Sequence, residues 1–528
     1  MGAVANAFNI AWRDYNTDGV PASGPFKPIK SVLRGLGPII EAYGSRWTIA
    51  NTAADGVTDD TLVIQQTIDA NKGGMILIPA NSTFAGVLLS GSSYNDTTIV
   101  CQGEVNLLPN GSVTKYGIFL QACANVTVYL DMNGNRTSMV QDEHIQCVAI
   151  AGCTNCAVVG KVREIRGDGV YISRNGATQN LDITVDIRGY NSSSDGRNLV
   201  SVISCQGLKI RAWSWDIGGN VNSVNEPGGV DLETNATGDS IHDFDVEVFA
   251  YSSAHATNLL GVLGLEVTGG QRDYNIYNGR VKATLRSYAS APNMGNFARC
   301  RGVTWDLDIA GYGSPADGME MDSCDNCSGH LKARNTIHAL IVGFADIINT
   351  CNIDLDVIGC GGSSQQSVWL NSHAGCHFTG IIGEAMASSG PAVYFSNNGA
   401  GGVQDNTYEI VITSANNNLP SAYQQQGGHA ITFTRCAVRG GSLSSFIASA
   451  GLANAFNGTF TGLNRIGVHG LNQLASIPTL GSWTQGDYVA NTAPVLATGK
   501  VTTGWSRLTT GTGNVLNTDW APQVVPNS

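Results

Sequence analysis

Residues 55–91 read DGVTDDTLVIQQTIDANKGGMILIPANSTFAGVLLSG, and this stretch decides the fold. Asp55-Gly56 predicts a turn, after which Thr58 or Asp59 can accept hydrogen bonds from the first free amides of a helix. The helix is expected to end near Asn71, just before a pair of glycines, and a short apolar strand follows. One helix that precedes a long series of short strands indicates a cap on an extended β structure.

The predicted helix has one apolar face, because Leu62, Ile64 and Ile68 recur at helical spacing and are available for burial. The strand after it, Met75–Ile78, is apolar throughout and is closed by Pro79. Helix and strand together therefore predict a covered end of a hydrophobic core.

From about Arg46 to Gly462 the chain repeats imperfectly, with a short strand of alternating apolar residues roughly every 20 to 40 residues. Strands this short cannot bury a face alone, so they are expected to stack into a solenoid. Further strands within a repeat, such as residues 241–250 and 302–311, favour a β-helix over a propeller, whose blades need about 40 or more residues. The predicted repeat strands are 86–90, 117–121, 147–151, 169–173, 199–204, 229–233, 264–268, 296–300, 318–322, 340–344, 367–371, 392–396 and 430–434.

The opening stretch also resembles a known signature. It contains D-G-x-x-D-D-T at 55–61, I-Q-x-x-I at 64–68 and G-G-x-I-x-x-P at 73–79. This combination is similar to the one that heads pectate-lyase-like right-handed parallel β-helices, in particular bacteriophage tailspikes; Ala54 replaces the usual glycine before the Asp. The resemblance implies an all-β, right-handed parallel β-helix that assembles as a homotrimer.

The sequence divides into three parts. Residues 1–46 lack strand alternation, and WRDYNTDGVPASG at 12–24 resembles the N-terminal segment of podovirus-type tail fibres and tailspikes. That resemblance implies attachment to phage tail or baseplate proteins; the alternative is a flexible arm packed on its own trimer. The β-helix is expected over 47–465, with its capping helix at 59–71, and a small β module over 466–528.

The C-terminal module contains the pattern W-x-x-G-D-x-V-x-N-x-x-P from Trp483 to Pro494, which resembles small β modules that close phage tail fibres and spikes. Trp483, Trp505 and Trp520 are candidates for stacking on sugars. The pattern favours a structural role for them, in the core of a small sandwich or at a trimer seam.

Composition limits the possible partners. Charged residues are only 13% of the chain, 42% are hydrophobic, and the net charge of −12 disfavours nucleic acid and anionic membranes as partners. No long apolar run and no basic-then-apolar N-terminus are present, so neither membrane insertion nor a signal peptide is expected. We expect synthesis in the host cytoplasm and, from the tailspike resemblance, a place in the virion tail that acts outside the cell.

The thirteen cysteines are expected to be reduced and structural. Cys153–Cys156 and Cys324–Cys327 suggest a zinc site, but a C-x-[NG]-apolar pattern shared by several repeats offers a better explanation. Thiols suit tight buried corners, and the Asn or Gly that follows supplies a left-handed turn. We therefore predict a thiol ladder, with no metal and no cofactor. The pattern begins at Cys123, Cys153, Cys205, Cys300 and Cys324, with Cys351, Cys376 and Cys436 at similar points.

An acidic row is the candidate active site. In three predicted repeat strands apolar residues alternate inward, so their carboxylate neighbours point outward. Repeats lie about 4.8 Å apart and outward neighbours on one strand about 6.5 to 7 Å apart, so the carboxyl groups are expected close together on an exposed face. The five candidate catalytic residues are Asp231, Glu233, Glu266, Glu320 and Asp322.

Carboxylates this close repel, so at least one is expected to have a raised pKa. Glycoside hydrolysis needs such a pair, one protonated acid and one base or nucleophile. We expect Glu233 or Glu266 to be the acid and Asp231 the base, with Glu320 and Asp322 as alternates. The alternatives are a solvated acidic face or a calcium site. Candidate substrate-binding residues are Tyr171, Arg174, Arg299, Trp369, Asn371 and Tyr394.

Two functional classes follow. The first is a tailspike that depolymerises a bacterial surface polysaccharide (capsule, exopolysaccharide or O-antigen), as a hydrolase or, second, a lyase. The second is a non-catalytic adhesin or structural tail component. A lyase needs Lys, Arg, Tyr or His as base, and these residue types are scarce on the predicted strands, so the sequence favours a hydrolase.

Overall fold

The computed structural model divides the chain into two compact units, residues 1–190 (unit 1) and 191–528 (unit 2), which are described separately. Residues 1–46, predicted to attach the protein to a virion, lie outside the described residues. The structure describes 47–109, 116–140, 144–192, 196–218, 220–221, 224–225, 228–252, 258–265, 274–288, 293–312, 317–343, 346–361 and 366–383, and shorter segments between 393 and 526.

Unit 1 begins with the predicted cap. Helix α3 (Thr61–Ala70) buries Ile64 and Ile68 as expected, whereas Leu62 is 70% exposed, contrary to the prediction. The Asp59 carboxylate accepts a hydrogen bond from the Thr61 amide at 3.0 Å, near the start of the helix. The helix starts and ends slightly inside the predicted 59–71 and leads to β2 (Met75–Ile78), which is fully buried.

Asp60 joins the start of this helix to the strands around it. Its carboxylate accepts hydrogen bonds from the Ala53 amide at 2.7 Å and the Thr83 amide at 3.2 Å. Because the Asp60 side chain is only 3% exposed, these charge-assisted bonds offset its desolvation. The D-D pair of the opening stretch thus has a structural role at the cap.

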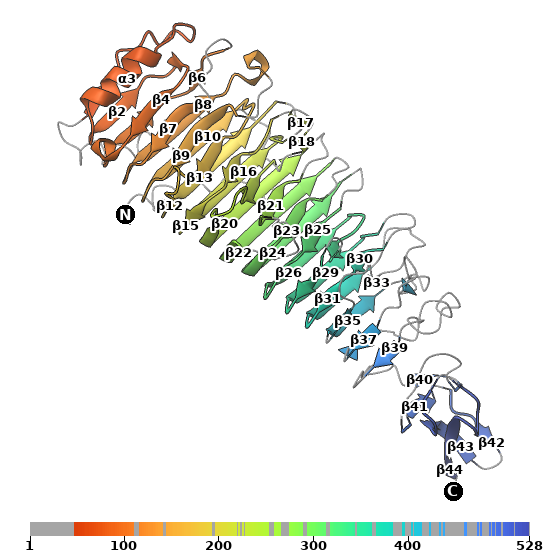
Figure 1. Ribbon diagram of the computed structural model, residues 1–528. Helices are drawn as coiled ribbons and strands as arrows, with labels where there is room; N and C mark the ends of the chain where they lie inside the picture. The colour runs from red at the N-terminus through yellow and green to blue at the C-terminus, as the bar shows by residue number, and fades with distance from the viewer. Residues whose placement is uncertain are drawn as a thin grey trace. The chain divides into compact units, whose positions relative to one another are not determined.

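Unit 1 stacks its strands in parallel, residue against residue, as Figure 1 shows. β8 (Thr127–Asn133), β10 (Ala157–Arg163) and β13 (Thr184–Tyr190) align without a register shift. The short repeat strands form a second parallel sheet with matching register. These are β4 (Val87–Ser90), β7 (Tyr116–Gln121), β9 (Gln146–Ala151) and β11 (Val170–Ser173).

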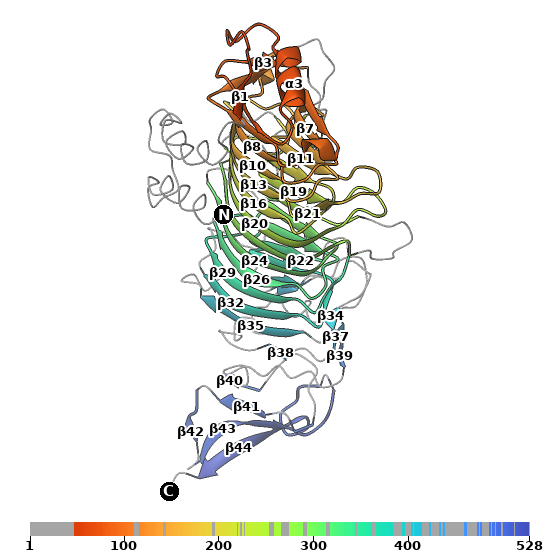
Figure 2. The same ribbon diagram turned by 90° about the vertical axis from the view of Figure 1, so that its left-hand side faces the viewer.

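Unit 2 has the same construction with longer strands on one side, which lie side by side in Figure 2. We call this side of unit 2 the long-strand sheet. It contains β16 (Lys209–Trp215), β20 (Ile241–Ser252), β22 (Ile276–Ser287), β24 (Cys300–Gly311), β26 (Ser328–Arg334), β29 (Asn352–Ile358), β32 (His377–Gly383) and β35 (Thr407–Thr413).

The short-strand sheet of unit 2 carries the candidate site. Its strands are parallel and in continuous register from β14 to β36. They are β14 (Val200–Val202), β19 (Val230–Glu233), β21 (Leu260–Leu263), β23 (Gly295–Ala298), β25 (Met319–Asp322), β27 (Leu340–Val342), β30 (Val368–Leu370), β33 (Val393–Phe395) and β36 (Ala422–Tyr423). The predicted fold class, an all-β right-handed parallel β-helix, is confirmed.

Two of the thirteen predicted repeat strands were wrong. The repeat strand expected at 264–268 is β21 (Leu260–Leu263) instead, four residues earlier. The strand near 430–434 is β37 (Thr432–Thr434), which pairs with β34 (Val403–Gln404) and β39 (Thr459–Thr461) in another sheet. In both places several apolar stretches lie close together in sequence, so alternation alone did not identify the pairing strand.

The core between the sheets is apolar. Val230, Leu232, Met319 and Met321 point inward from the short strands and are fully buried, as their alternation predicted. Burying each such side chain contributes about 1.5 to 3 kcal/mol. The short-strand sheet is therefore a rigid support for the residues on its outer side.

The predicted thiol ladder is present. The Sγ atoms of Cys123 and Cys153 lie 3.6 Å apart, and those of Cys300 and Cys324 lie 3.5 Å apart. All described cysteines are free and buried. The residue two positions after Cys123, Cys153, Cys205, Cys300 and Cys324 has the expected positive φ, 51° at Asn155, for example, and 63° at Gly302. At Cys351 and Cys376 the positive-φ residue instead comes just before the cysteine.

Near the C-terminus, β41 (Tyr488–Asn491), β43 (Lys500–Arg507) and β44 (Trp520–Pro526) pair antiparallel. Trp505 and Trp520 are buried together with Val489, which fits the predicted core role for these two tryptophans. Trp483 lies outside the described residues. No helix in the described part of the chain is long and apolar enough to cross a membrane.

Candidate active site

The register of the short-strand sheet fixes which outward side chains are neighbours. Asp231 and Glu320 belong to one column across the strands, and Glu233 and Asp322 to the next. Strands β21 and β23 separate the two acidic strands, so the pair on β19 lies about 14 Å from the pair on β25 at the backbone. The acidic row is therefore two separate pairs.

The β21 strand changes the composition of the row. Gly261 and Leu263 are the register partners of Asp231 and Glu233, in the place predicted for Glu266. Glu266 comes after the strand and lies outside the described residues. The expectation that Glu266 bridges the two pairs on the sheet was wrong.

Burial also differs from the prediction of one exposed face. Asp231 is 1% exposed and Asp322 is 8% exposed, whereas Glu233 and Glu320 are half-buried. Alternation identifies residues that point away from the core but says nothing about chain segments that cover them.

The candidate substrate-binding residues belong to different units. Tyr171 and Arg174 belong to unit 1 and are half-buried. Trp369 is half-buried in the Glu320 column, while Asn371 is fully buried. The side chain of Tyr394 lies outside the described set.

Arg299 has a structural contact in place of the predicted sugar contact. Its Nε donates to the Gly264 carbonyl at 2.6 Å, and its backbone φ of 53° is left-handed. The Arg299 amide donates to the Asp322 carbonyl at 3.0 Å. Arg299 therefore joins the segment after β21 to the end of β25, beside the second acidic pair.

Glu320, half-buried on β25, has a perturbed carboxyl group. Burial raises its pKa to about 7, and the charge of Asp322 and a hydrogen bond with it act in the same direction. Asn293 donates a hydrogen bond to Glu320, which opposes the rise, while the charge of Asp317 adds to it. In the part of the chain that the structure describes, no cation pairs with Glu320. Near neutral pH the Glu320 carboxyl is therefore about half protonated.

Two residues that the sequence analysis missed lie beside this pair. The Nδ1 atom of His338 is 2.7 Å from Asp317 Oδ1, and the His338 backbone amide donates to the same oxygen at 3.3 Å. His338 is 6% exposed, and its Nε2 atom has no hydrogen-bond partner among the described residues. The Trp369 ring lies 5.9 Å from the His338 ring, centroid to centroid.

The chain geometry explains this contact. Asp317 and His338 each stand two residues before a short strand, β25 and β27 respectively, so in-register stacking brings them together. The Gly318 amide donates to the His338 carbonyl at 2.7 Å. A Cβ at position 318 would collide with the Ala339 carbonyl oxygen, so this close approach requires glycine. Counting back from the aligned strands would have found the pair.

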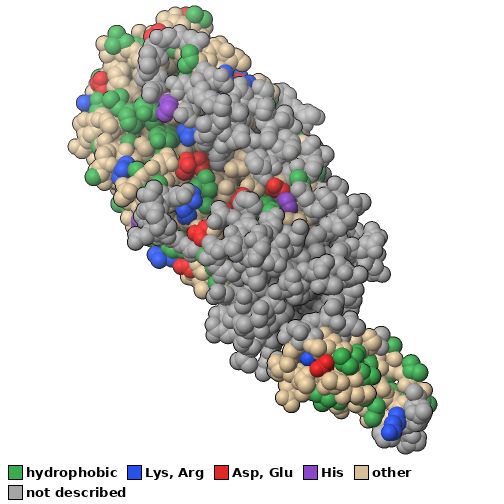
Figure 3. Space-filling view, turned by 45° about the vertical axis from the view of Figure 1, so that its right-hand side comes forward, with side chains coloured by type: hydrophobic (Ala, Val, Ile, Leu, Met, Phe, Trp, Pro, Cys, Tyr) green, Lys and Arg blue, Asp and Glu red, His purple; other side chains and the backbone are tan. Residues whose placement is uncertain are grey.

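Asp322 also has neighbours that position it. The Asp346 amide lies 3.4 Å from Asp322 Oδ1, and Ser323 Oγ donates to Asp346 Oδ2 at 2.7 Å. The β25 cluster, as we call Asp317, Glu320, Asp322 and His338, thus combines acidic groups with a histidine. Figure 3 shows one face of the molecule, on which acidic, basic and histidine side chains lie among uncharged ones.

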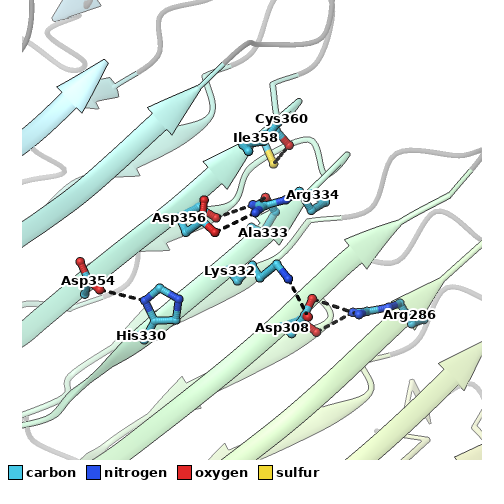
Figure 4. A network of polar contacts seen from close by, with 10 residues as sticks. All are labelled: Arg286, Asp308, His330, Lys332, Ala333, Arg334, Asp354, Asp356, Ile358 and Cys360. Carbon is cyan, nitrogen blue, oxygen red and sulfur yellow. Dashed lines mark hydrogen bonds and ion pairs between the residues drawn. The ribbon is translucent and has the colours of Figure 1, made fainter. Parts of the chain in front are cut away.

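On the long-strand sheet, in contrast, Asp308 and Asp356 pair with cationic side chains, as Figure 4 shows. Asp308 lies between Arg286 at 3.0 Å and Lys332 at 3.3 Å. Asp356 pairs with Arg334 at 2.7 Å. These are exposed or half-buried ion pairs in which each carboxylate has a cationic neighbour.

Two clusters of three cysteines each could supply thiol ligands to a soft metal ion. They are Cys123, Cys153 and Cys156 in unit 1, and Cys300, Cys324 and Cys327 in unit 2. Cys324 Sγ lies 3.4 Å from the Phe297 carbonyl oxygen, so its thiol proton has a backbone acceptor. Burial raises the pKa of the Cys324 thiol well above its usual value. Both facts favour neutral, structural thiols.

Comparisons with known proteins give distant similarities. No family model matches the chain, and no curated protein matches it at a significant level. The A-module of the mannuronan C-5 epimerase AlgE4 from Azotobacter vinelandii is 16% identical, with a TM-score of 0.38 over 72% of this chain and 97% of that one.

Two further solved structures are similar at the same level. The endo-xylogalacturonan hydrolase from Aspergillus tubingensis is 13% identical, with a TM-score of 0.35 over 74% of this chain and 95% of that one. The ORF18 protein of Geobacillus virus E2 is 12% identical, with a TM-score of 0.33 over 76% of this chain and 65% of that one. At these values the similarities assign no activity to this chain.

Proposed function

We propose that this protein is a tailspike-type depolymerase that hydrolyses a bacterial surface polysaccharide at the β25 cluster. The observation that carries the proposal is the half-buried Glu320 on β25 beside Asp322, with no cation paired to it among the described residues; this environment raises its pKa. A carboxyl group with a pKa of about 7 can hold a proton and donate it at neutral pH. This is the property that glycoside hydrolysis requires of its acid.

In this proposal Glu320 protonates the glycosidic oxygen. Its hydrogen bond with Asp322 brings the two carboxyl groups closer than the roughly 5 Å of a retaining pair, so Asp322 is too near to activate water on the opposite side of the sugar. Asp322 instead keeps the proton on Glu320 by like-charge repulsion. The β25 pair, the alternate of the sequence analysis, thus replaces the Asp231 and Glu233 pair as the preferred candidate.

A polysaccharide lyase is the second candidate function, because the cluster contains a histidine with an available nitrogen. Elimination from a uronic sugar needs a base that removes a carbon-bound proton, and residues of that type are scarce on the predicted strands. His338 supplies that residue type beside Glu320.

Product analysis tests the proposal and separates these functions. The full chain is incubated with capsular, exopolysaccharide and lipopolysaccharide preparations, and new reducing ends and near-ultraviolet absorbance are measured. Hydrolysis predicts new reducing ends without absorbance, whereas a lyase also produces absorbing unsaturated ends. Glu320→Gln should abolish release, and Glu247→Gln, an exposed carboxylate on the long-strand sheet, is the matched control. Binding without release by the wild-type chain would identify a non-catalytic adhesin.

The remaining parts of the proposal concern assembly. We propose a homotrimer in the virion tail that residues 1–46 attach to other tail or baseplate proteins. Light scattering of the full chain at micromolar concentration should give three times the monomer mass. A chain that lacks residues 1–46 should keep its depolymerase activity and lose its attachment to the particle.

A further inference from the structure

We propose that His338 is the general base of this reaction, acting through Nε2, and that Asp317 positions it. The inference rests on the proposed function and adds the second group that hydrolysis needs. Nothing in the acidic pattern of the sequence assigned a role to either residue.

The contacts of His338 define its tautomer. Asp317 is a hydrogen-bond acceptor for Nδ1 at 2.7 Å, so Nδ1 carries the proton and Nε2 keeps its lone pair in the neutral ring. The second bond, from the His338 backbone amide to the same Asp317 oxygen, fixes the carboxylate against the ring. The buried Nε2 is therefore a hydrogen-bond acceptor with a defined direction and no partner among the described residues.

The burial of His338 Nε2 is a second observation, besides the contact with Asp317, that supports a role for this nitrogen. The His338 side chain is more than nine-tenths buried, yet Nε2 has no partner among the described residues. A buried polar atom without a hydrogen bond costs about 1 to 3 kcal/mol, so such atoms need an explanation. A bound water or a sugar hydroxyl would satisfy Nε2.

The position relative to Glu320 suits an inverting reaction. His338 and Glu320 come from neighbouring strands and are offset by three residues along the strand direction, about 10 Å at the backbone. An inverting mechanism needs its two groups roughly 6.5 to 9.5 Å apart, which leaves room for a water. Asp317, which contacts His338, also acts electrostatically on Glu320, so the groups share one environment.

In the reaction, His338 Nε2 removes a proton from water, and the water oxygen forms a bond to the anomeric carbon. The bond from that carbon to the glycosidic oxygen breaks, and its electron pair stays on the oxygen, which takes the Glu320 proton. The products are a hemiacetal and an alcohol. Proton transfer from the imidazolium back to the Glu320 carboxylate, through solvent, restores both groups.

The charged groups around His338 are acidic. Asp317 contacts it from the segment before β25, Glu320 and Asp322 lie on β25, and the uncharged Trp369 packs from β30. Asp317 accepts the hydrogen bond from Nδ1 of His338, which leaves Nε2 as the proton acceptor. The cluster therefore supports a base at position 338 while it keeps Glu320 protonated.

The chain contains a matched control for this pair. His330 Nδ1 lies 2.9 Å from Asp354 Oδ2 on the long-strand sheet, a contact drawn in Figure 4. The His330 side chain is 42% exposed and the Asp354 side chain 54%. The His330–Asp354 pair has the same residue types and the same kind of contact as the His338–Asp317 pair. His330, however, is open to solvent and lies among ion pairs. Its removal should not affect catalysis.

The experiment compares pH profiles of kcat/KM for the wild-type chain, His338→Gln, Asp317→Asn and His330→Gln, with folding checked by circular dichroism. His338→Gln should lower kcat by about 10² to 10⁴-fold and remove the acidic limb of the profile. Asp317→Asn should keep the acidic limb of the profile but shift it along the pH axis. The profile of His330→Gln should match that of the wild type. An unchanged acidic limb in folded His338→Gln would overturn the inference.

Chemical rescue tests the role of His338 even if the glutamine in His338→Gln disturbs the packing around position 338. Added imidazole should restore part of the turnover of His338→Ala and none of that of Glu320→Gln. Absence of rescue in folded His338→Ala, together with an acidic limb like that of the wild type, would exclude His338 as the base. Full activity of Glu320→Gln would instead remove the proposed function itself, so the two failures are distinguishable.

Discussion

The two outer faces of unit 2 place their carboxylates in opposite environments. On the long-strand sheet Asp308 and Asp356 each contact a cation, and their side chains are 34% and 39% exposed. On the short-strand sheet Glu320 is half-buried beside another carboxyl group, and burial raises its pKa. The first arrangement needs no function to explain it. The second is costly to the fold, and this difference is the physical reason for placing catalysis at β25.

The largest expected effect is a loss of turnover in variants of the short-strand sheet but not in variants of the long-strand sheet. Glu320→Gln should lower turnover by about 10² to 10⁴-fold, because the acid is lost, whereas Asp322→Asn should have a smaller effect, because burial still raises the pKa of Glu320. Asp308→Asn and Asp356→Asn should stay within about twofold of the wild type. Reducing-end assays on one polysaccharide measure all four. A greater loss from Asp231→Asn and Glu233→Gln would move the active site to β19.

The second prediction concerns stability against pH. The pKa of Glu320 rises from 4.5 to about 7 on folding, so the folded chain binds this proton more tightly than the unfolded chain. The stabilisation is complete below pH 4.5 and is lost as the pH rises through about 7. The loss amounts to about 3 kcal/mol, from 1.36 kcal/mol for each pKa unit.

Denaturant unfolding of the wild type and Glu320→Gln at a series of pH values measures this loss. The variant should lack it, because a glutamine cannot ionise. The same pH dependence in both proteins would show that another group is responsible.

The third prediction concerns the ion pairs of the long-strand sheet. Asp308→Asn should cost about 0.5 to 1 kcal/mol of unfolding free energy at low ionic strength, because half-exposed pairs are weak. The difference from the wild type should disappear near 1 M salt, where the Debye length is about 3 Å. A loss that persists at high salt would indicate a packing role for Asp308.

The smallest expected effect is at the thiol ladders inside both units. A chelator should leave the melting temperature unchanged, because neutral thiols hydrogen-bonded to carbonyls need no ion. Metal analysis of the purified chain should accompany the melt. A lower melting temperature after chelation would assign a metal to one of the thiol groups.

Much of the fold could be predicted from residues 55–91 and from the alternation of the repeat strands. Inward positions such as Val230 and Met321 follow from a period of two, and the cysteine corners follow from a shared pattern. The register failed at β21 because Leu260–Leu263 has no alternation, whereas residues 264–268 do. Local pattern cannot decide between two apolar segments when tertiary pairing selects one.

The candidate site was predicted less completely. Glu320 and Asp322 came from alternation, which did not predict that Glu320 is half-buried and Asp322 buried. Asp317 and His338 precede their strands and carry no periodic signal, so only the stacked register brings them together. Their contact is a property of the tertiary structure.

The proposed function depends most directly on the proton held by Glu320. Carbon-13 labelling of glutamate carboxyl groups, with Glu320→Gln for assignment, allows this group to be titrated by NMR in the folded chain. We predict a pKa of about 7 in the wild type, and a lower value in Asp322→Asn, where the neighbouring negative charge is absent. Titration near the ordinary value of 4.5 in the wild type, unchanged by Asp322→Asn, would contradict the assignment of Glu320 as the acid.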